Sequence, residues 1–338
     1  MARHGNVRPD RQGQRHTRRR LRRERRRRMT EARVKRVRDA VDGVLLLDKP
    51  VGLSSNDALI KAKRFMNAKK AGHTGTLDPF ATGLLPLCFG EATKFSQDLL
   101  EADKTYLATV HLGVRTDTGD TEGQVLETRE VTSTQVEIEA VMARFRGPIK
   151  QVPPMYSALK RDGKPLYEYA REGITLEREA RDVVIHKLEL VSWEAPFLKI
   201  EVTCSKGTYI RVLGEDIGAA LGCGAHLNAL RRIQVGALTT YKMVTLEDLA
   251  AHAAPRELLA PVDALLSSFP RIVLNAELAK RFLHGQRLPL GKEPGITVPT
   301  PYEGRVRIYA EDGRLLGTGI FGEYAILAPE RLIAAPQN

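Results

Sequence analysis

The sequence predicts an α+β fold with a small β-rich unit at its C-terminal end. Strand-like runs at Lys104–Gly113, Asp182–Trp193 and Phe197–Cys204 do not alternate strictly with helices, which argues against a doubly wound sheet. The 338 residues, of which 42% are hydrophobic and 28% charged, can bury one large core or two modest ones. A fibre, a peptide hormone and a disordered chain are therefore excluded.

The first folded element is expected at Gly43–Pro50. This apolar run reads as a buried strand that ends in a turn at its Lys-Pro pair. Ser54 or Ser55 then supplies a side chain that can cap a helix from about Asn56 to Asn67. The domain is thus predicted to open with a strand, a loop and a helix.

Helical periodicity marks three later stretches. One of them has apolar residues at i, i+3, i+4 and i+7, namely Ile138, Val141, Met142 and Phe145, and Gly147-Pro148 should end it. The other two helical stretches lie near Thr208–Leu221 and Leu246–His252.

The C-terminal unit begins after the segment between Pro261 and Pro270. A short helix at Ala276–His284 precedes strand-like runs at Arg305–Ala310 and Leu315–Phe321, which a turn joins. We expect three parts: a basic extension at 1–40, a large α+β domain at 41–265 and a small β-rich domain at 266–338.

Arginine dominates the N-terminal extension. Residues 1–40 hold 17 Lys and Arg against 4 Asp and Glu, whereas residues 41–338 hold 36 against 37. The dense charge of Arg18–Arg28 predicts disorder. Three interpretations stay open: an arm that binds RNA by neutralising phosphates, a solvated tail, or untranslated sequence before a start at Met29. A mitochondrial transit peptide is disfavoured because serine is absent and acidic residues interrupt the cations.

The sequence also indicates where the protein is located and which cysteine-based sites it lacks. No apolar stretch reaches the length of roughly 18 to 20 residues that a bilayer requires, and the N-terminus lacks the apolar core of a secretory signal. Cys88, Cys204 and Cys223 are too few and too scattered for a disulfide framework or a zinc site. We therefore expect a cytoplasmic protein.

The stretch Gly72–Gly83 is the strongest candidate for a functional loop. It crowds glycines, threonines and one acid into twelve residues, and its glycines allow backbone approaches that a Cβ would block. Asp78 precedes Pro79, which biases it away from helix and holds its carboxylate on extended backbone. Because Asp-Pro is also a common turn, the loop by itself leaves catalysis and an ordinary turn both open.

From this loop outward, the sequence resembles the B-type pseudouridine synthases, the bacterial tRNA pseudouridine-55 synthases. The resemblance rests on five motifs in matching order: Gly43–Pro50 with Gly52–Asn56, the loop Gly72–Gly83, Lys104–Tyr106, Cys204–Arg211 and Leu230–Arg232. It is strong over about residues 43–240. The C-terminal unit resembles, more loosely, the PUA-like RNA-binding module of that family.

The resemblance implies a mixed-sheet catalytic domain that isomerises the T-loop uridine at tRNA position 55. It implies no cofactor and no metal, tRNA as the partner, and a monomer. Asp78 corresponds to the catalytic carboxylate, and its role as a nucleophile or a base stays open. Arg211 would pair with Asp78, favour its charged form and fix its orientation.

Four further residues receive substrate roles from the resemblance. Tyr106 would stack on the uracil and help to remove the C5 proton. Tyr209 and Leu230 would lie in the pocket for the target nucleotide, although from the sequence alone both read as packing residues. His73 would contact RNA rather than catalyse. Lys49 and Pro50 are expected to support the catalytic loop.

Extruding a stacked base costs on the order of a few kcal/mol, so RNA must be held by a local basic surface. Basic residues precede the catalytic loop at Lys61, Lys63, Arg64, Lys69 and Lys70, and Arg231 and Arg232 are expected to extend this surface. A solvated helix face explains at least half of these lysines equally well.

Two other functions fit parts of the sequence. A cysteine-dependent uridine methyltransferase could use Cys88 or Cys204, but the chain has no G-x-G-x-x-G loop for a methyl donor. A non-catalytic RNA-binding or RNA-folding protein would fit the basic arm and the small C-terminal unit. The presence of Asp78, Tyr106 and Arg211 argues against a loss of chemistry.

Overall fold

The computed structural model describes residues 37–299 and 303–333. The predicted basic extension lies almost wholly outside the described residues, so its disorder stays a prediction. The chain separates into two units, Met1–Asp39 and Ala40–Asn338, and the folded elements belong to the second. Within the described part, no helix is long and apolar enough to cross a membrane.

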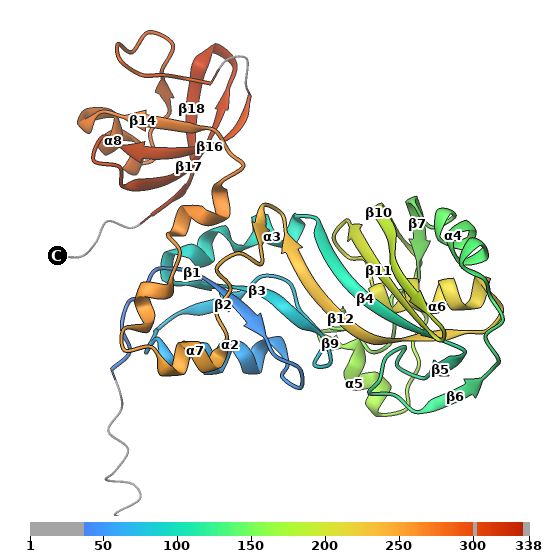
Figure 1. The fold of residues 1–338 in the computed structure, drawn as a ribbon. Helices are drawn as coiled ribbons and strands as arrows, with labels where there is room; N and C mark the ends of the chain where they lie inside the picture. Colours follow the sequence, from blue (N-terminus) through green and yellow to red (C-terminus); the bar gives the residue numbers. More distant parts are fainter. Residues whose placement is uncertain (1–36, 300–302, 334–338) are drawn as a thin grey trace, which may run out of the picture. The chain divides into compact units, whose positions relative to one another are not determined.

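A nine-stranded mixed sheet forms the centre of the catalytic body (Figure 1). Its path is β1, β3, β12, β4, β11, β10, β7, with β2 paired to β3 and β13 to β12. The bounds are β1 Gly43–Lys49, β2 Ala71–His73, β3 Thr82–Phe89, β4 Lys104–Leu112, β7 Gly147–Gln151, β10 Arg181–Glu194, β11 Phe197–Cys204, β12 Ala225–Val235 and β13 Leu238–Thr239. The predicted α+β class and mixed sheet are confirmed.

One junction in this sheet differs from the others. Strands β3 and β12 run parallel and share only two residue pairs, Arg231 with Thr82 and Arg232 with Gly83, whereas the other pairings in the sheet are antiparallel. Because β3 follows the catalytic loop directly, this junction joins the loop to the rest of the sheet.

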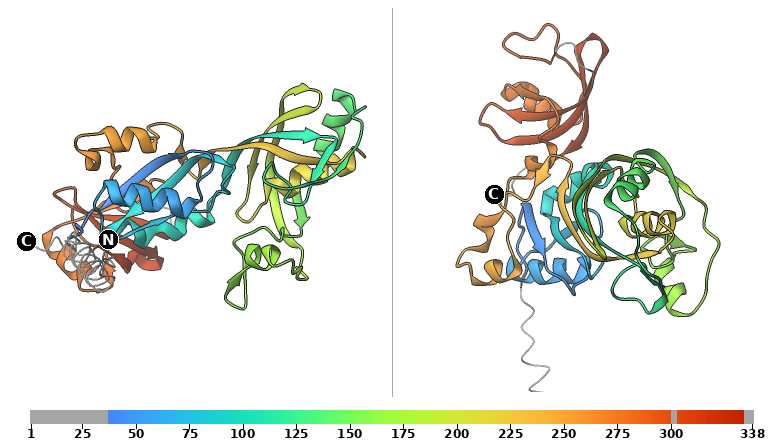
Figure 2. Two further views of the ribbon diagram at one scale, coloured as in Figure 1. Left: turned by 90° about the horizontal axis from the view of Figure 1, so that it is seen from below. Right: turned by 45° about the vertical axis from the view of Figure 1, so that its right-hand side comes forward.

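Helices cover the sheet in two groups. Helices α4 and α6 lie within the curl of β4, β10, β11 and β12, and α2 and α7 lie beside β1 and β2 (Figures 1 and 2). The bounds are α2 Ser55–Phe65, α3 Ser96–Glu101, α4 Gln135–Ala143, α5 Leu166–Arg171, α6 Ile210–Ala220 and α7 Leu246–Ala251, with 3-10 turns at Gly90–Phe95, Pro255–Leu258 and Val262–Leu266.

The predicted helices form, with shifted ends. Ser54 caps α2, because its side chain accepts a hydrogen bond from the Asp57 backbone. Helix α4 ends at Ala143, so Phe145 packs against the core from the following turn rather than from the helix. Gly147 and Pro148 do not cap α4. They begin strand β7 instead.

Two short ribbons leave the sheet near the cavity described below. One pairs β5 Val114–Thr116 with β6 Val125–Thr128, and the other pairs β8 Lys160–Arg161 with β9 Lys164–Pro165. The loop between β5 and β6, and the segment from Tyr156 to α5, both face this cavity.

The C-terminal part has a sheet and a core of its own. Its five strands run in the order β14, β16, β17, β18, β15, and α8 packs against them. The bounds are β14 Arg271–Leu274, α8 Ala276–Leu283, β15 Leu288–Pro289, β16 Gly304–Ala310, β17 Leu315–Gly322, a 3-10 turn at Glu323–Ala325 and β18 Ile326–Leu332. A separate cluster of buried apolar residues, from Ile272 to Leu327, fills its interior. The expected β-rich, PUA-like unit is therefore present.

Candidate active site

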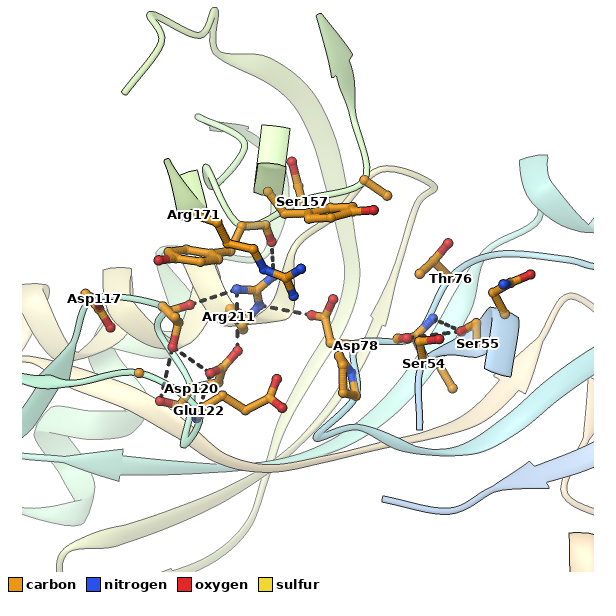
Figure 3. A pocket seen from close by; sticks show the side chains of 18 of the residues that line it. Ser54, Ser55, Thr76, Asp78, Asp117, Asp120, Glu122, Ser157, Arg171 and Arg211 are labelled. Atoms are coloured by element: carbon orange, nitrogen blue, oxygen red, sulfur yellow. Dashed lines mark hydrogen bonds and ion pairs between the residues drawn. The ribbon is translucent and has the colours of Figure 1, made fainter. Parts of the chain in front are cut away.

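A cavity of about 810 Å³ opens between the catalytic loop and α6 (Figure 3). Its walls come from the start of α2, the loop around Asp78, the loop between β5 and β6, the segment Tyr156–Ala158, α5 and the side chain of Arg211. The polar and charged side chains labelled in Figure 3 converge on it from segments that are far apart in the sequence. Its size lies within the range of about 300–1,000 Å³ that is usual for small-molecule sites.

Buried polar contacts fix the catalytic loop to the strand and helix that precede it. The Ser55 hydroxyl donates to the Leu77 carbonyl at 3.0 Å and accepts from the Leu77 N–H at 2.8 Å. The Lys49 ammonium is fully buried and donates to the carbonyls of Pro50, Leu53 and Pro79. Burial lowers the pKa of Lys49 to about 8. The expected supporting role of Lys49 agrees with these contacts.

Two of the three loop glycines are required by geometry. Gly75 and Gly83 have φ of +77° and +98°, and a Cβ on Gly83 would lie 2.3 Å from the Arg232 carbonyl oxygen. Gly72 is different, because its φ is ordinary and nothing lies within 4 Å of the position of a Cβ. The expectation that Gly72 allows a special backbone approach is therefore wrong.

Arg211 connects the two acidic walls of the cavity. It is 4% exposed, and its Nε lies 3.0 Å from Asp78 Oδ2 while its Nη1 lies 3.4 Å from Asp120 Oδ2 (Figure 3). Nη1 also donates to the Thr118 carbonyl at 2.8 Å, and Nη2 to the Tyr156 carbonyl at 2.5 Å. Each nitrogen of the guanidinium thus has a partner, and the Asp78 carboxylate is held in one orientation.

The charge on Asp78 is set by opposing effects. Its side chain is 36% exposed to the cavity, yet protein surrounds most of it, and this desolvation raises the pKa of the carboxyl. Arg211 and Lys49 lower that pKa, and Asp120 raises it. The pKa of Glu122 on the facing wall is raised in the same way, by burial and then by Asp120 and Asp78. The carboxyls of Asp78, Asp120 and Glu122 therefore gather around the Arg211 guanidinium.

The four predicted substrate residues do not line the same cavity. His73 lines the cavity, and its Nδ1 is buried without a partner among the described residues. Burial, with Arg232, lowers the pKa of His73, which favours a neutral ring. Tyr106 and Tyr209 are not among the lining residues, and Leu230 lines a different, smaller depression. Tyr106 is 8% exposed.

The charge of Asp78 nevertheless acts on both tyrosines. Burial, and to a smaller degree the Asp78 carboxylate, raise the pKa of the phenols of Tyr106 and Tyr209. The backbone of Tyr209 is held by the buried amide of Gln151, which accepts from the Tyr209 N–H at 3.0 Å and donates to its carbonyl at 3.3 Å. This clamp fixes the start of α6 and with it the position of Arg211.

One segment that lines the cavity was not predicted from the sequence. The loop Asp117–Gly123 supplies Asp120, which is 3% exposed and accepts hydrogen bonds from the Thr118 hydroxyl and the Glu122 N–H. This loop is rich in threonine, glycine and acidic residues, as the catalytic loop is, and this shared composition could have identified it as a candidate site from the sequence. Arg171 of α5, stacked on Tyr167, was also missed.

Arg232 of the Leu230–Arg232 motif does not extend an RNA-binding surface as expected, whereas the side chain of Arg231 is 40% exposed and its part in that surface stays a prediction. Arg231 forms a bidentate ion pair with Asp48, at 3.0 and 2.7 Å. Arg232 is 1% exposed, so its side chain cannot reach a phosphate. The basic residues before the loop fit the prediction better, because Lys61, Arg64, Lys69 and Lys70 are all exposed.

The cysteines take no part in the cavity. Cys88 and Cys204 are buried, and burial raises the pKa of each thiol to about 12. Neither is therefore a ready nucleophile, which weakens the methyltransferase alternative. Among the residues described, no group of three or more His, Cys, Asp and Glu side chains is arranged to hold a metal ion.

Comparison with known proteins assigns the family. Residues 63–210 match the N-terminal domain of TruB family pseudouridylate synthases, residues 211–267 the C-terminal domain of tRNA pseudouridylate synthase B, and residues 270–333 the C-terminal domain of pseudouridine synthase II TruB. A relative from Burkholderia mallei, tRNA pseudouridine synthase B, is 65% identical over 303 residues, which cover 89% of this chain and 97% of the relative. The chain belongs to the TruB family of pseudouridine synthases.

Further relatives support the TruB family assignment and the fold. The tRNA pseudouridine synthase B of Ralstonia nicotianae is 59% identical over 309 residues, covering 88% of this chain and 96% of the relative. A chain in the crystal structure of a Cbf5-Nop10-Gar1 complex aligns with a TM-score of 0.66 at 28% identity, over 86% of this chain and 84% of that one. A chain in an H/ACA RNP bound to a substrate RNA containing 2′-deoxyuridine gives a TM-score of 0.65 at 25% identity, over 87% and 86%.

Proposed function

We propose that this protein converts the uridine at position 55, in the T-loop of tRNA, to pseudouridine. The observation that carries the proposal is the Asp78 carboxylate, which Arg211 holds at 3.0 Å on the wall of a nucleoside-sized cavity. Membership of the TruB family and the name tRNA pseudouridine synthase B on the relatives support it. The proposed substrate is the T-arm, and the C-terminal unit, residues 266–338, serves as a second RNA-binding domain beside the catalytic domain at 41–265.

The reaction is an isomerisation that balances without an added reactant. The N1–C1′ bond of the uridine breaks, the uracil turns within the cavity, and C5 bonds to C1′. The proton on C5 is then lost, and N1 gains one. The protein must therefore hold a detached base, supply a carboxylate next to the sugar and accept a proton from C5.

Asp78 is placed to supply the carboxylate. Its Oδ2 is held by Arg211, whereas Oδ1 has no polar partner among the described residues and faces the cavity. The ion pair keeps the group charged against the desolvation that raises its pKa. An oriented, ionised oxygen at this point can attack the sugar, attack the base or remove a sugar proton.

The base is proposed to contact a set of residues around Asp78. We assign base stacking and C5 proton removal to Tyr106, and further contacts of the target nucleotide to Tyr209 and Leu230. His73, neutral on the cavity wall, is assigned an RNA contact. Because Tyr106 is 8% exposed, the uracil can reach its ring only if the cavity wall moves when the nucleotide enters.

The RNA backbone is proposed to lie along exposed cations near the cavity. Lys61 and Arg64 on α2, and Lys69 and Lys70 after it, are exposed and have no ion pair with a carboxylate in the described part of the chain. Arg171 adds a cation at the rim of the cavity. Phosphate contacts of this kind hold the flipped-out nucleotide in register without reading its sequence.

We propose that the protein acts in the cytoplasm as a monomer.

Release of tritium from C5 of uridine in a tRNA transcript tests the proposal. Wild-type protein should release one tritium per tRNA, and carbodiimide treatment with reverse transcription should map the product to position 55. Asp78→Asn should lower the single-turnover rate by about 10⁴-fold or more, while the Kd for tRNA changes by less than about threefold, because only one charge is lost. Asp117→Asn removes a carboxylate from the same cavity that is not paired with Arg211, and it should retain far more activity. Turnover of the Asp78→Asn protein near the wild-type rate contradicts the proposal.

A further inference from the structure

Arg232 is a buried cation that the proposed reaction leaves unexplained. At 1% exposure it is among the largest fully buried side chains in the described part of the protein. Burying a guanidinium costs several kcal/mol unless its donors are satisfied, and a carboxylate usually supplies the compensation. No carboxylate of the described residues forms an ion pair with Arg232. This contrasts with Arg211, which lies between Asp78 and Asp120.

The partners of Arg232 are backbone carbonyls at the two ends of the catalytic loop. Its Nε donates to the Leu84 carbonyl at 2.8 Å, just after the loop, and its Nη2 donates to the Gly75 carbonyl at 3.1 Å, three residues before Asp78. The Nη1 atom lies against Gly75. A Cβ atom added to Gly75 would be 3.4 Å from Nη1. One planar guanidinium therefore spans the loop and sets the distance between its ends.

The same side chain faces Tyr106. Arg232 on β12 is the direct cross-strand partner of Tyr106 on β4, so both side chains project from the same face of the sheet. The charged and titratable groups that act on the Tyr106 phenol are Arg232 from β12, Cys204 from β11 and Asp78 from the loop. Arg232 is the one cation among them. Burial raises the pKa of the phenol, and Arg232 lowers it.

The backbone of Arg232 completes the arrangement. It pairs with Gly83 of β3 in the two-residue parallel junction, and Gly83 approaches it so closely that no Cβ fits. Arg232 therefore contacts the start of the loop, the end of the loop and the strand of Tyr106. A side chain that served only to fill the core would need none of these polar contacts.

We propose that Arg232 is a positioning residue for the reaction, which sets the Tyr106 phenol and the Gly75 end of the catalytic loop in one fixed geometry relative to Asp78. This inference rests on the proposed roles of Asp78 and Tyr106. It assigns to Arg232 no contact with RNA and no chemical step.

A double-mutant cycle tests the proposal with tritium release under single-turnover conditions. Arg232→Met keeps the buried volume and removes the donors, and we expect a rate loss of about 100-fold, the cost of displacing a reacting group by about an ångström. The Kd for tRNA should change by less than about threefold, because the side chain is buried. Arg232→Lys keeps the charge but not the planar fork, and it should recover about tenfold of the loss.

The coupling to Tyr106 separates positioning from a structural role. In a Tyr106→Phe background, Arg232→Met should cost at least about tenfold less than in the wild type, because the phenol that it positions is absent. Arg146→Met is a control at an exposed position, since Arg146 also donates to a backbone carbonyl, that of Leu188, away from the catalytic loop. It should change the rate by less than about twofold.

Three results overturn the proposal: an equal loss in both backgrounds, a loss confined to tRNA binding, or failure of both Arg232→Met and Arg232→Lys to fold, as judged by thermal unfolding. The last result would make Arg232 a residue of the fold alone. The proposed function is tested separately by the wild-type protein. Absence of tritium release from wild type refutes that function, whereas active wild type with uncoupled variants refutes only the role of Arg232.

Discussion

Two clusters of charge around the catalytic loop are built on different principles. In the carboxylate cluster, Arg211 binds Asp78 and Asp120 with Glu122 nearby. In the carbonyl cluster, which consists of Lys49, Lys104 and Arg232, each buried cation donates to backbone carbonyls. A carboxylate can be protonated on acidification, whereas a backbone carbonyl cannot. Acidification can therefore change the first cluster, while the cations and contacts of the second persist as the pH falls.

The largest effect is expected from breaking the carboxylate cluster. Arg211→Met leaves the carboxyls of the cavity without their shared cation, and we expect single-turnover tritium release to fall by about 10³-fold or more. Arg211→Lys should recover part of this loss, because the charge remains while the planar fork that contacts Asp78 and Asp120 together does not. A Met variant that is as active as the Lys variant would show that charge pairing at Asp78 is unimportant.

Crowding the contact between Gly83 and the backbone of Arg232 should lower the stability of the protein. Gly83→Ala places a methyl group against the Arg232 carbonyl and strains a φ of +98°, so the free energy of unfolding should fall by about 2–4 kcal/mol. Gly72→Ala is the matched control in the same segment. It should change the free energy by less than about 1 kcal/mol, because nothing lies within 4 Å of the added carbon. Urea unfolding of both variants measures the difference, and equal values would contradict the close approach at Gly83.

The pH dependence of turnover should report the carboxylate cluster. Because burial raises the pKa of Asp78, its active, ionised form should be lost on acidification at a higher pH than for an ordinary aspartate. Arg211 lowers this pKa, so Arg211→Lys, with its weaker pairing, should move the acid limb of the rate profile up by about 1 pH unit. The single-turnover rate of both proteins between pH 4 and 8 checks this, and superimposable limbs would count against Asp78 as the titrating group.

The smallest effect concerns the alkaline stability of the carbonyl cluster. Burial lowers the pKa of Lys104 to about 8 from the usual 10.5, so the folded state releases this proton before the unfolded state does. Between these values the unfolded state binds more protons, and the lysine's contribution to stability should improve as the pH rises. The stability of wild type relative to Lys104→Met should therefore increase by about 1–3 kcal/mol from pH 8 to 10.5 in urea unfolding. A constant difference would refute the lowered pKa.

The sequence predicted the fold where apolar runs were continuous and failed where polar residues interrupted a strand. Strand β1 was evident from its unbroken apolar run. Strand β3 is almost entirely buried but contains Gly83 and Pro86, which usually argue against a sheet interior. Strand β12 carries two adjacent arginines, and sequence patterns alone do not reveal that one of them is buried between carbonyls.

The candidate site was predicted only in part, because the sequence shows local composition but not the contacts between distant segments. The crowded loop pointed to Asp78, and the resemblance supplied Arg211, which the structure brings within 3.0 Å of it. Asp120 and Glu122 were not predicted, because nothing in their own segment reveals the Arg211 guanidinium near them. The positions of Tyr106 and Leu230 outside the cavity lining depend on packing across the sheet, which no local pattern encodes.

The parallel junction between β3 and β12 also bears on how the protein is made. Thr82 contacts the Leu230 carbonyl across 148 positions of sequence, and contacts so distant are slow to form during folding. During translation, Asp78, Tyr106 and Arg211 all emerge before strand β12 is complete. A nascent chain should therefore carry every proposed catalytic residue and still be inactive until β12 leaves the ribosome. Synthesis of this one strand would then set the moment at which activity begins.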